Sequence, residues 1–208
     1  MAAKGLGMLT LRTSKTSPFG RKIRIAIGAL GMEGMVHIQL ADTMDPMDTL
    51  RIQNPLGKIP TLVLEDGSSI FDSPVILEYL NLRHGGDVLI PNGGDRLRVL
   101  QQQAVADGLL DAALLIVYEA RFREKLQHSE AWLNHQREKI ERTLAYTSLL
   151  YADDFRLPAH AGCIAQASAL GYLDFRFSGA WRRSHPKLSD WLDEFSRTVP
   201  SYIETIPA

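Results

Sequence analysis

A hydroxyl, a proline and an aromatic ring stand together in the stretch TSPFGRK, residues 16–22, where a short apolar strand ends and a helix is expected to begin. Thr16 and Ser17 each carry a hydroxyl that can donate to an anion, and the amino end of a helix favours negative charge. Three basic residues follow within two turns, namely Arg21, Lys22 and Arg24. The stretch indicates either an ordinary helix cap at Ser17 or a hydroxyl placed to stabilise an anion.

A second polar pair, Asp72 and Ser73, precedes the apolar segment PVILEYL. Ser73 stands directly before Pro74, which is typical of a helix N-cap with proline in the first turn. The serine hydroxyl and the free N–H groups of that first turn form a site for a carboxylate, and Asp72 supplies a charge for an ammonium. Taken alone, the pair also fits a plain helix cap.

The elements that must position these groups alternate in the first part of the chain. The pattern predicts a strand at 8–12, a helix that ends at Gly31 and a strand at 36–40. Together they form a β-α-β unit, in which the two strands are expected to pair in parallel. A hairpin that turns at Asp66-Gly67 and a helix over 72–84 follow. The order predicts a small mixed α/β sheet.

The rest of the chain is predicted to be helical. The segment GGDVLIPNGGD is rich in glycine and predicts a linker. Beyond it, the apolar pattern predicts helices over 96–127, 129–151, about 160–173 and about 186–197. We therefore expect a first domain at 8–85, a linker at 86–94 and an all-helical domain at 95–208.

Composition limits the classes of function. The 208 residues are 45% hydrophobic and 23% charged, as in an ordinary globular protein, and the formal net charge of -1 argues against nucleic acid as the main partner. Cys163 is the single cysteine, which rules out an intrachain disulfide and fits a reducing, cytoplasmic location. The start MAAKGLGMLTL lacks the features of a signal peptide, and no apolar run reaches membrane-spanning length, so we expect no membrane partner.

A sheet module of about 80 residues followed by a helical module resembles the cytosolic glutathione transferases. The segment NPLGKIPTLVLEDGSSIFDSPVILEYL, residues 54–80, resembles the glutathione-site segment of that family, and ADGLLDA (106–112), QREKIERTL (136–144) and LGYLDFRF (170–177) are similar to the helical half of bacterial members. The resemblance covers about residues 8 to 200. It implies a thioredoxin-like N-terminal domain, an all-α C-terminal domain and a homodimer.

The resemblance also implies where glutathione binds. The KIP sequence, Lys58, Ile59 and Pro60, matches the position where the residue before a cis proline pairs with the cysteinyl backbone of glutathione. Asp72 and Ser73 match the pair that grips the γ-glutamyl end. Family members often have glutamate in place of Asp72, so the shorter side chain is expected to shift that contact.

In serine- and cysteine-dependent members, the residue that contacts the thiol lies at the start of the first helix. Ser17 aligns there, so its hydroxyl is expected to donate to the glutathione thiolate, and Thr16 is the rival. A tyrosine-dependent mechanism is disfavoured because no tyrosine precedes Tyr79. Glutathione is then a co-substrate, and no cofactor is expected.

The electrophile is expected to bind between the sheet module and the first long helix. Its predicted walls are Phe19, which also faces glutathione, and residues of the stretch 107–122: Asp107, Leu110, Asp111, Tyr118 and Arg121. Tyr118 or Arg121 is placed to meet an anionic group on the substrate. Asp107 and Asp111, one turn apart, also suggest a metal pair, but no histidine or cysteine stands at ligand spacing, so we expect no metal.

One position departs from the family. Where members carry a Ser/Thr-x-x-Asp capping box before a C-terminal helix, this sequence has His160 and Cys163. A missing box costs about 1 kcal/mol, so replacing His160 by Ser with Cys163 by Asp is expected to raise the melting temperature. Cys163 is expected to be a buried structural thiol.

These residues leave several functions open. Conjugation of glutathione to small hydrophobic electrophiles is the first. Glutathione-dependent thiol transfer is disfavoured, because serine at position 17 cannot form a mixed disulfide. A weak glutathione-dependent peroxidase and a non-enzymatic interaction protein on the same fold remain.

Overall fold

The computed structural model describes residues 8–151 and 159–207 of the chain. Residues 1–7, which include most of the segment without signal-peptide features, lie outside the described residues. Residue 208, the predicted end of the helical domain, does so too.

A four-stranded mixed sheet of order β2-β1-β3-β4 forms the first module. Its strands are β1 (Leu9–Thr13), β2 (Val36–Leu40), β3 (Thr61–Val63) and β4 (Ser69–Phe71). Strand β1 pairs in parallel with β2 and antiparallel with β3, which pairs antiparallel with β4. The predicted order of strands and helices is therefore confirmed, and the fold is the one that the resemblance implied.

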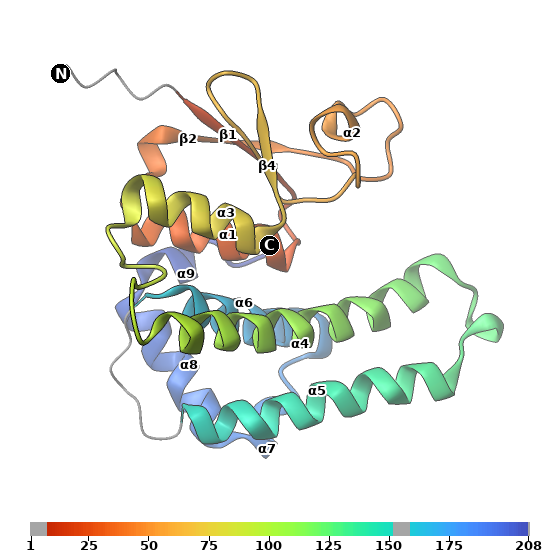
Figure 1. Ribbon diagram of the computed structural model, residues 1–208. Helices are drawn as coiled ribbons and strands as arrows, with labels where there is room; N and C mark the ends of the chain where they lie inside the picture. Colours follow the sequence, from red (N-terminus) through yellow and green to blue (C-terminus); the bar gives the residue numbers. More distant parts are fainter. Residues whose placement is uncertain (1–7, 152–158, 208) are drawn as a thin grey trace.

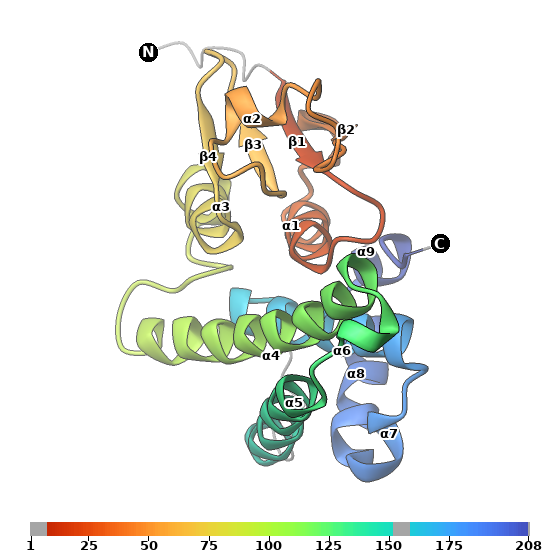
Figure 2. The same cartoon turned by 90° about the vertical axis from the view of Figure 1, so that its right-hand side faces the viewer.

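Helices α1 (Pro18–Ala29) and α3 (Ser73–Leu80) lie between the sheet and the helical module (Figures 1 and 2). In α1, Ile23 and Ile27 are buried one turn apart. Four short elements of the described residues were not predicted, since none is long enough to show a helical period: η1 (Glu33–Met35), α2 (Leu50–Gln53), α7 (Trp181–Ser184) and α9 (Pro200–Glu204). The predicted helix over 72–84 is found as α3 followed by the π-helical turn η2 (Asn81–Gly85).

Gly20 allows α1 to approach strand β1 closely. A Cβ atom at Gly20 would lie 1.9 Å from Oγ1 of Thr13, so any larger residue would push the helix from the strand. This approach sets the position of the turn between β1 and α1, which carries Thr16 and Ser17.

The helical module is built around α6 (Ala161–Phe177), whose residues 161–173 are all buried. The other helices are α4 (Arg96–Phe122), η3 (Lys125–Gln127), α5 (Glu130–Leu150), α7 (Trp181–Ser184), α8 (Pro186–Thr198) and α9 (Pro200–Glu204). Helix α4 ends at Phe122, before the predicted end at 127, and η3 follows. No helix in the described ranges has both the length and the apolar character needed to cross a membrane.

Hydrogen bonds from the helical module hold α1 along its length. Ser168 Oγ in α6 donates to the carbonyl of Pro18 at 2.7 Å, and Ser201 Oγ in α9 donates to the carbonyl of Ile25 at 3.0 Å. Arg21, 2% exposed, donates through Nη2 to the carbonyl of Tyr202 at 2.9 Å. The amino end of α1 is thus fixed by the second module as well as by the sheet.

An ion pair also joins the two modules. The side chain of Lys22 in α1 is fully buried, and its Nζ donates to both carboxylate oxygens of Asp107 in α4, at 2.6 and 2.8 Å. Burial lowers the pKa of Lys22, and the charge of Asp107 opposes that change. Burial raises the pKa of Asp107, and the charge of Lys22 opposes that rise. Each charge therefore depends on the other.

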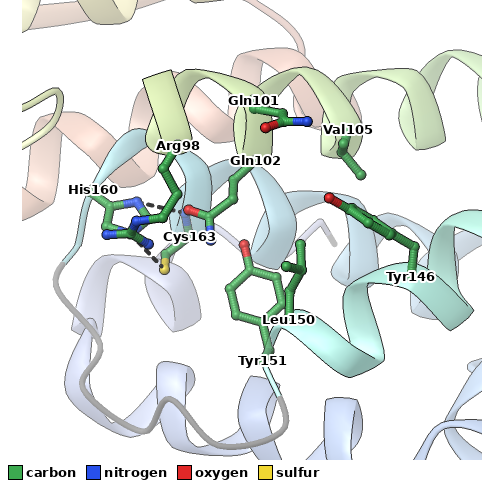
Figure 3. Close-up of a pocket in the computed structure, with 9 residues that line it drawn as sticks. All are labelled: Arg98, Gln101, Gln102, Val105, Tyr146, Leu150, Tyr151, His160 and Cys163. Carbon is green, nitrogen blue, oxygen red and sulfur yellow. Dashed lines mark hydrogen bonds between the residues drawn. The ribbon is translucent and has the colours of Figure 1, made fainter. Parts of the chain in front are cut away.

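The expectation that α6 lacks an N-terminal cap is wrong. His160 is the N-cap residue, and its Nδ1 accepts a hydrogen bond from the N–H of Cys163 at 3.2 Å (Figure 3). A neutral imidazole that accepts at Nδ1 carries its proton on Nε2, which lies 3.5 Å from Sγ of Cys163. An imidazole thus replaces the hydroxyl, and Cys163 is buried as expected.

Because the cap is present in another form, replacing His160 by Ala should lower the free energy of unfolding by about 1 kcal/mol. For a chain of this size, that is a fall of about 2–4 °C in melting temperature, measurable by calorimetry. The change of His160 to Ser with Cys163 to Asp should bring no such fall. A variant His160→Ala as stable as the parent would show that the imidazole does not cap the helix.

Replacing Lys22 by Met should cost about 3 kcal/mol, because it leaves the largely buried carboxylate of Asp107 without its cation. Adding Asp107→Leu should recover most of that loss, since an apolar pair of similar size avoids the cost of burying charge. Urea unfolding measures the free energy of unfolding of the single and the double variant. The exposed Lys15 gives the matched control, Lys15→Met. A double variant less stable than Lys22→Met would contradict this account.

Candidate active site between the two modules

A cavity of about 330 Å³ lies where the two modules meet. That volume is within the range of sites for small ligands. Helix α1, the segment before β3, the start of α3 and helix α4 contribute its lining: Phe19, Asn54, Leu56, Lys58, Ile59, Pro60, Asp72, Ser73, Pro74, Asp107 and Asp111. Eight of these eleven residues are among those predicted from the sequence.

The segment that leads to the cavity is held by its own polar groups. The Asn54 amide donates to the carbonyl of Lys58 at 2.9 Å, and Thr61 Oγ1 donates to the same carbonyl at 3.0 Å. The bond between Ile59 and Pro60 is cis, as the resemblance implied. Among the described residues, none forms a hydrogen bond with the N–H or C=O of Ile59.

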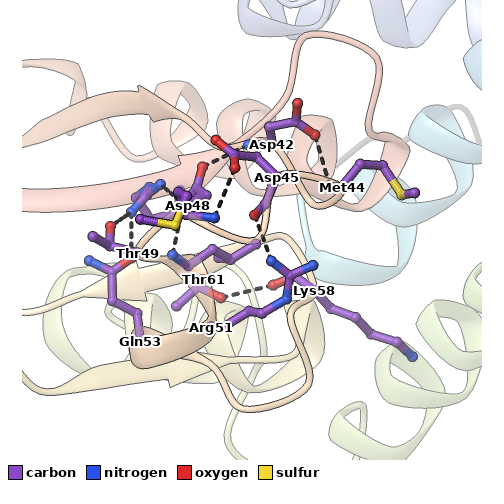
Figure 4. Close-up of polar contacts among 12 residues, drawn as sticks. Asp42, Met44, Asp45, Asp48, Thr49, Arg51, Gln53, Lys58 and Thr61 are labelled. Carbon is purple, nitrogen blue, oxygen red and sulfur yellow. Dashed lines mark hydrogen bonds and ion pairs between the residues drawn. The ribbon is translucent and has the colours of Figure 1, made fainter.

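Arg12 in β1 fixes the start of that segment. It is 2% exposed, and its guanidinium donates to Asp48 Oδ1 at 2.5 Å, to Gln53 Oε1 at 2.6 Å and to Thr49 Oγ1 at 2.9 Å. Helix α2 is thereby anchored to the sheet (Figure 4). The Lys58 side chain points away from this cluster, so its ammonium is not used there.

The start of α3 differs from the prediction by one residue. Asp72, not Ser73, is the N-cap residue, and it has a positive φ of 69°. Such a backbone is uncommon for a residue other than glycine and is often found at functional sites. Ser73 is 1% exposed, and its Oγ has no hydrogen-bond partner among the described residues. A buried hydroxyl of this kind costs free energy unless something pairs with it.

Three carboxylates face this cavity. Asp107 pairs with Lys22, whereas the exposed Asp111 has no hydrogen bond or ion pair within the described ranges. The surrounding protein desolvates the Asp111 carboxylate in part and so raises its pKa; Lys58 opposes that rise, Asp72 adds to it and Lys22 opposes it. The cavity therefore combines acidic groups with an unpaired hydroxyl.

Ser17 lies at the amino end of α1, two residues before Phe19. It is half-buried, and its Oγ accepts from the N–H of Gly20 at 3.1 Å, so the structure confirms the helix cap. Neither Ser17 nor the half-buried Thr16 is among the described residues that line the cavity.

Three other predicted residues of α4 lie elsewhere. Leu110 is fully buried in the hydrophobic core. Tyr118 lines a separate hollow near the end of α4, with Phe122 and Trp132. Arg121 is exposed, and its guanidinium lies over the ring of Phe122.

Sequence reasoning missed three lining residues, namely Asn54, Leu56 and Pro74. All three belong to the segment that carried the resemblance, so their nearness to Ile59 and Ser73 was the available signal. It also missed the pairing of Lys22 with Asp107, which no local pattern signals across 85 positions.

A metal site is not found at the pair Asp107 and Asp111. Within residues 8–151 and 159–207, no group of three or more histidine, cysteine, aspartate or glutamate side chains is arranged to hold a metal ion. Another cavity, of about 350 Å³, lies between α4, α5 and the start of α6 (Figure 3). It contains none of the residues predicted for catalysis or for binding.

Known proteins resemble this chain in sequence and in fold. A family model described as the N-terminal domain of glutathione S-transferase matches residues 16–83. The uncharacterized GST-like protein YibF of Escherichia coli (strain K12) is 36% identical over 197 residues, which cover 90% of this chain and 96% of YibF.

Solved structures of glutathione transferases are also similar to this chain in sequence and fold. A glutathione transferase family member from Pseudomonas fluorescens Pf-5, with bound glutathione, is 38% identical with a TM-score of 0.89, over 96% of this chain and 99% of that chain. A glutathione S-transferase from Methylobacterium radiotolerans JCM 2831, in complex with glutathione sulfonate, is 33% identical with a TM-score of 0.87, over 96% and 95%. With this likeness along nearly its whole length, the chain belongs to the glutathione S-transferase family.

Proposed function

We propose that this protein binds reduced glutathione in the cavity between its modules and conjugates the thiol to small hydrophobic electrophiles. The observation that carries the proposal is the buried, unpartnered hydroxyl of Ser73 at the start of α3. The bound glutathione in the Pseudomonas fluorescens protein supports it. A homodimer, as the resemblance implies, and a cytoplasmic location, as the single cysteine suggests, are part of the proposal.

The docking follows from the lining groups. The γ-glutamyl carboxylate accepts from Ser73 and from the free N–H groups of the first turn of α3, and its ammonium pairs with Asp72. The cysteinyl backbone pairs with the peptide groups of Ile59, which are unpaired within the described residues. The ammonium of Lys58 then meets the glycyl carboxylate.

The thiol in this arrangement faces the amino end of α1. Ser17 Oγ accepts from Gly20 N–H, so the hydroxyl proton is left to donate to the thiolate. Capping the helix and stabilising the anion are therefore compatible roles for one side chain. The positive end of α1 adds to the effect.

The magnitude of this effect is modest. An unperturbed thiol has a pKa of ~8.5 and is about 3% ionised at pH 7, and lowering the pKa to about 6.5 takes ~2.7 kcal/mol. One hydrogen bond to a charged group contributes about 1.5–3 kcal/mol and a helix end about 0.3–1 kcal/mol. The gain of about 25-fold in thiolate is offset by ~10-fold lower nucleophilicity. Most of the rate enhancement must come from positioning the electrophile.

Replacing Ser73 by Ala should weaken glutathione binding about ten-fold, since one hydrogen bond of about 1.4 kcal/mol is lost. Titration calorimetry measures the affinity. Ser69→Ala, in strand β4 and outside the cavity, is the matched control. Unchanged affinity in Ser73→Ala would contradict the docking, and a parent protein that binds no glutathione would favour the interaction-protein alternative.

Replacing Ser17 by Ala should raise the pKa of bound glutathione by about one to two units, the equivalent of the lost hydrogen bond. The ultraviolet absorbance of the thiolate measures that pKa. The loss of kcat should be largest at low pH and should shrink as the pH rises above the new pKa, because bound glutathione is then ionised in both the parent and the variant.

Two further variants assign the hydroxyl. Ser17→Thr keeps a hydroxyl and should retain most activity, while Thr16→Ala should leave the thiol pKa unchanged. If Thr16→Ala raises the pKa and Ser17→Ala does not, Thr16 is the donor. Hydroperoxide reduction by the same variants tests the peroxidase alternative.

A further inference from the structure

With glutathione docked as proposed, one charged group of the cavity has no counterpart. The charges of glutathione are met by Asp72, Lys58 and Ser73. Lys22 and Asp107 neutralise each other. The carboxylate of Asp111 is left over.

Asp111 is well placed to act on the second substrate. It lies on α4 one helical turn beyond Asp107, it lines the cavity, and it is exposed. Phe19, from α1, lines the same cavity, and its ring already has one cation near it, since Nζ of Lys22 lies over the ring at 5.6 Å from its centroid. A carboxylate together with an aromatic face is the chemistry that recognises an organic cation. The unpaired hydroxyl of Ser73 shows independently that this cavity lacks a ligand group.

We propose that the electrophile side of this cavity selects substrates that carry a positive charge, such as a quaternary ammonium group, and that Asp111 is the residue that selects them. The inference rests on the proposed function. It replaces the expectation of an anionic substrate group, because Tyr118 and Arg121, the residues expected to meet one, do not line the cavity within the described part of the chain.

The other charged groups around Asp111 are compatible with this role. Lys58 lines the same cavity and lowers the pKa of Asp111 against the effect of desolvation. In the docked state Lys58 is engaged by the glycyl carboxylate, so it no longer neutralises Asp111. Asp72 is likewise engaged in the docked state, by the γ-glutamyl ammonium. The three carboxylates Asp72, Asp107 and Asp111 already outnumber the ammonium groups of Lys22 and Lys58 in the free cavity. After docking, Asp111 is the carboxylate left without a counterpart, so a cationic electrophile enters a negative site.

Acrylate esters test the charge preference without changing the reaction. The thiolate forms a bond to the terminal alkene carbon, the C=C π bond breaks, and the adjacent carbon takes a proton from solvent. The cationic ester is 2-(acryloyloxy)ethyl trimethylammonium, 3,3-dimethylbutyl acrylate is its neutral counterpart of the same shape, and 3-sulfopropyl acrylate is the anionic one. Each kcat/KM is divided by the uncatalysed rate with glutathione at the same pH.

We expect the cationic ester to be preferred over the neutral one by about five-fold, the upper end for an exposed ion pair, and the anionic ester to be the poorest substrate. Asp111→Asn should abolish this preference. Its affinity for glutathione, measured by calorimetry, should stay within about two-fold of the parent value. Asp190→Asn, an exposed aspartate of α8, is the matched control and should keep the preference.

Two results contradict the inference in distinguishable ways. Equal turnover of the three esters, or a preference that survives in Asp111→Asn, with glutathione bound normally, overturns the charge selection alone. Failure to bind glutathione and to conjugate any ester overturns the proposed function and the charge selection together.

Discussion

The ammonium of Lys22, fully buried at the contact of α1 with α4, meets the carboxylate of Asp107 on the opposite module. Neither charge is stable there without the other, so the pair fixes how the sheet module sits on the helices. Asp107 also lines the cavity. The interaction that holds the modules together is thus part of the wall of the candidate active site.

Several other contacts also fix the elements that surround the cavity. Ser168 and Arg21 hold α1 to the helical module, and Gly20 lets the helix approach β1, so the amino end of α1 has a defined position. On the other side, Arg12 anchors α2, from which the segment to Ile59 and its cis bond begins. Rigid elements thus surround a cavity whose polar groups, in part, lack partners. That is the arrangement expected of a preorganised binding site.

The sequence was informative where physical signals are local. The strand at 36–40, the turn at Asp66-Gly67 and the cap at Ser17 each depend on neighbouring residues, and all three are found. Contacts between distant positions were not accessible in the same way. Nothing near position 107 signals a lysine partner at 22, and no helical pattern distinguishes the buried Leu110 from residues that face a cavity.

Two errors show the same limit at closer range. The cap at His160 was overlooked because imidazole is an unusual acceptor at that position, although its geometry serves as well as a hydroxyl. The N-cap at Asp72 was displaced by one residue, because a positive φ at aspartate is set by the surrounding fold and not by local preference. Because Asp72 and not Ser73 is the N-cap residue, the Ser73 hydroxyl is left available for a ligand.

A crystal structure of the protein with reduced glutathione tests the central claim most directly. The account predicts the γ-glutamyl carboxylate on Ser73 and the sulfur within about 3.5 Å of Oγ of Ser17, as a hydrogen bond to sulfur requires. A tripeptide bound outside the cavity, or a sulfur directed away from the amino end of α1, would contradict it.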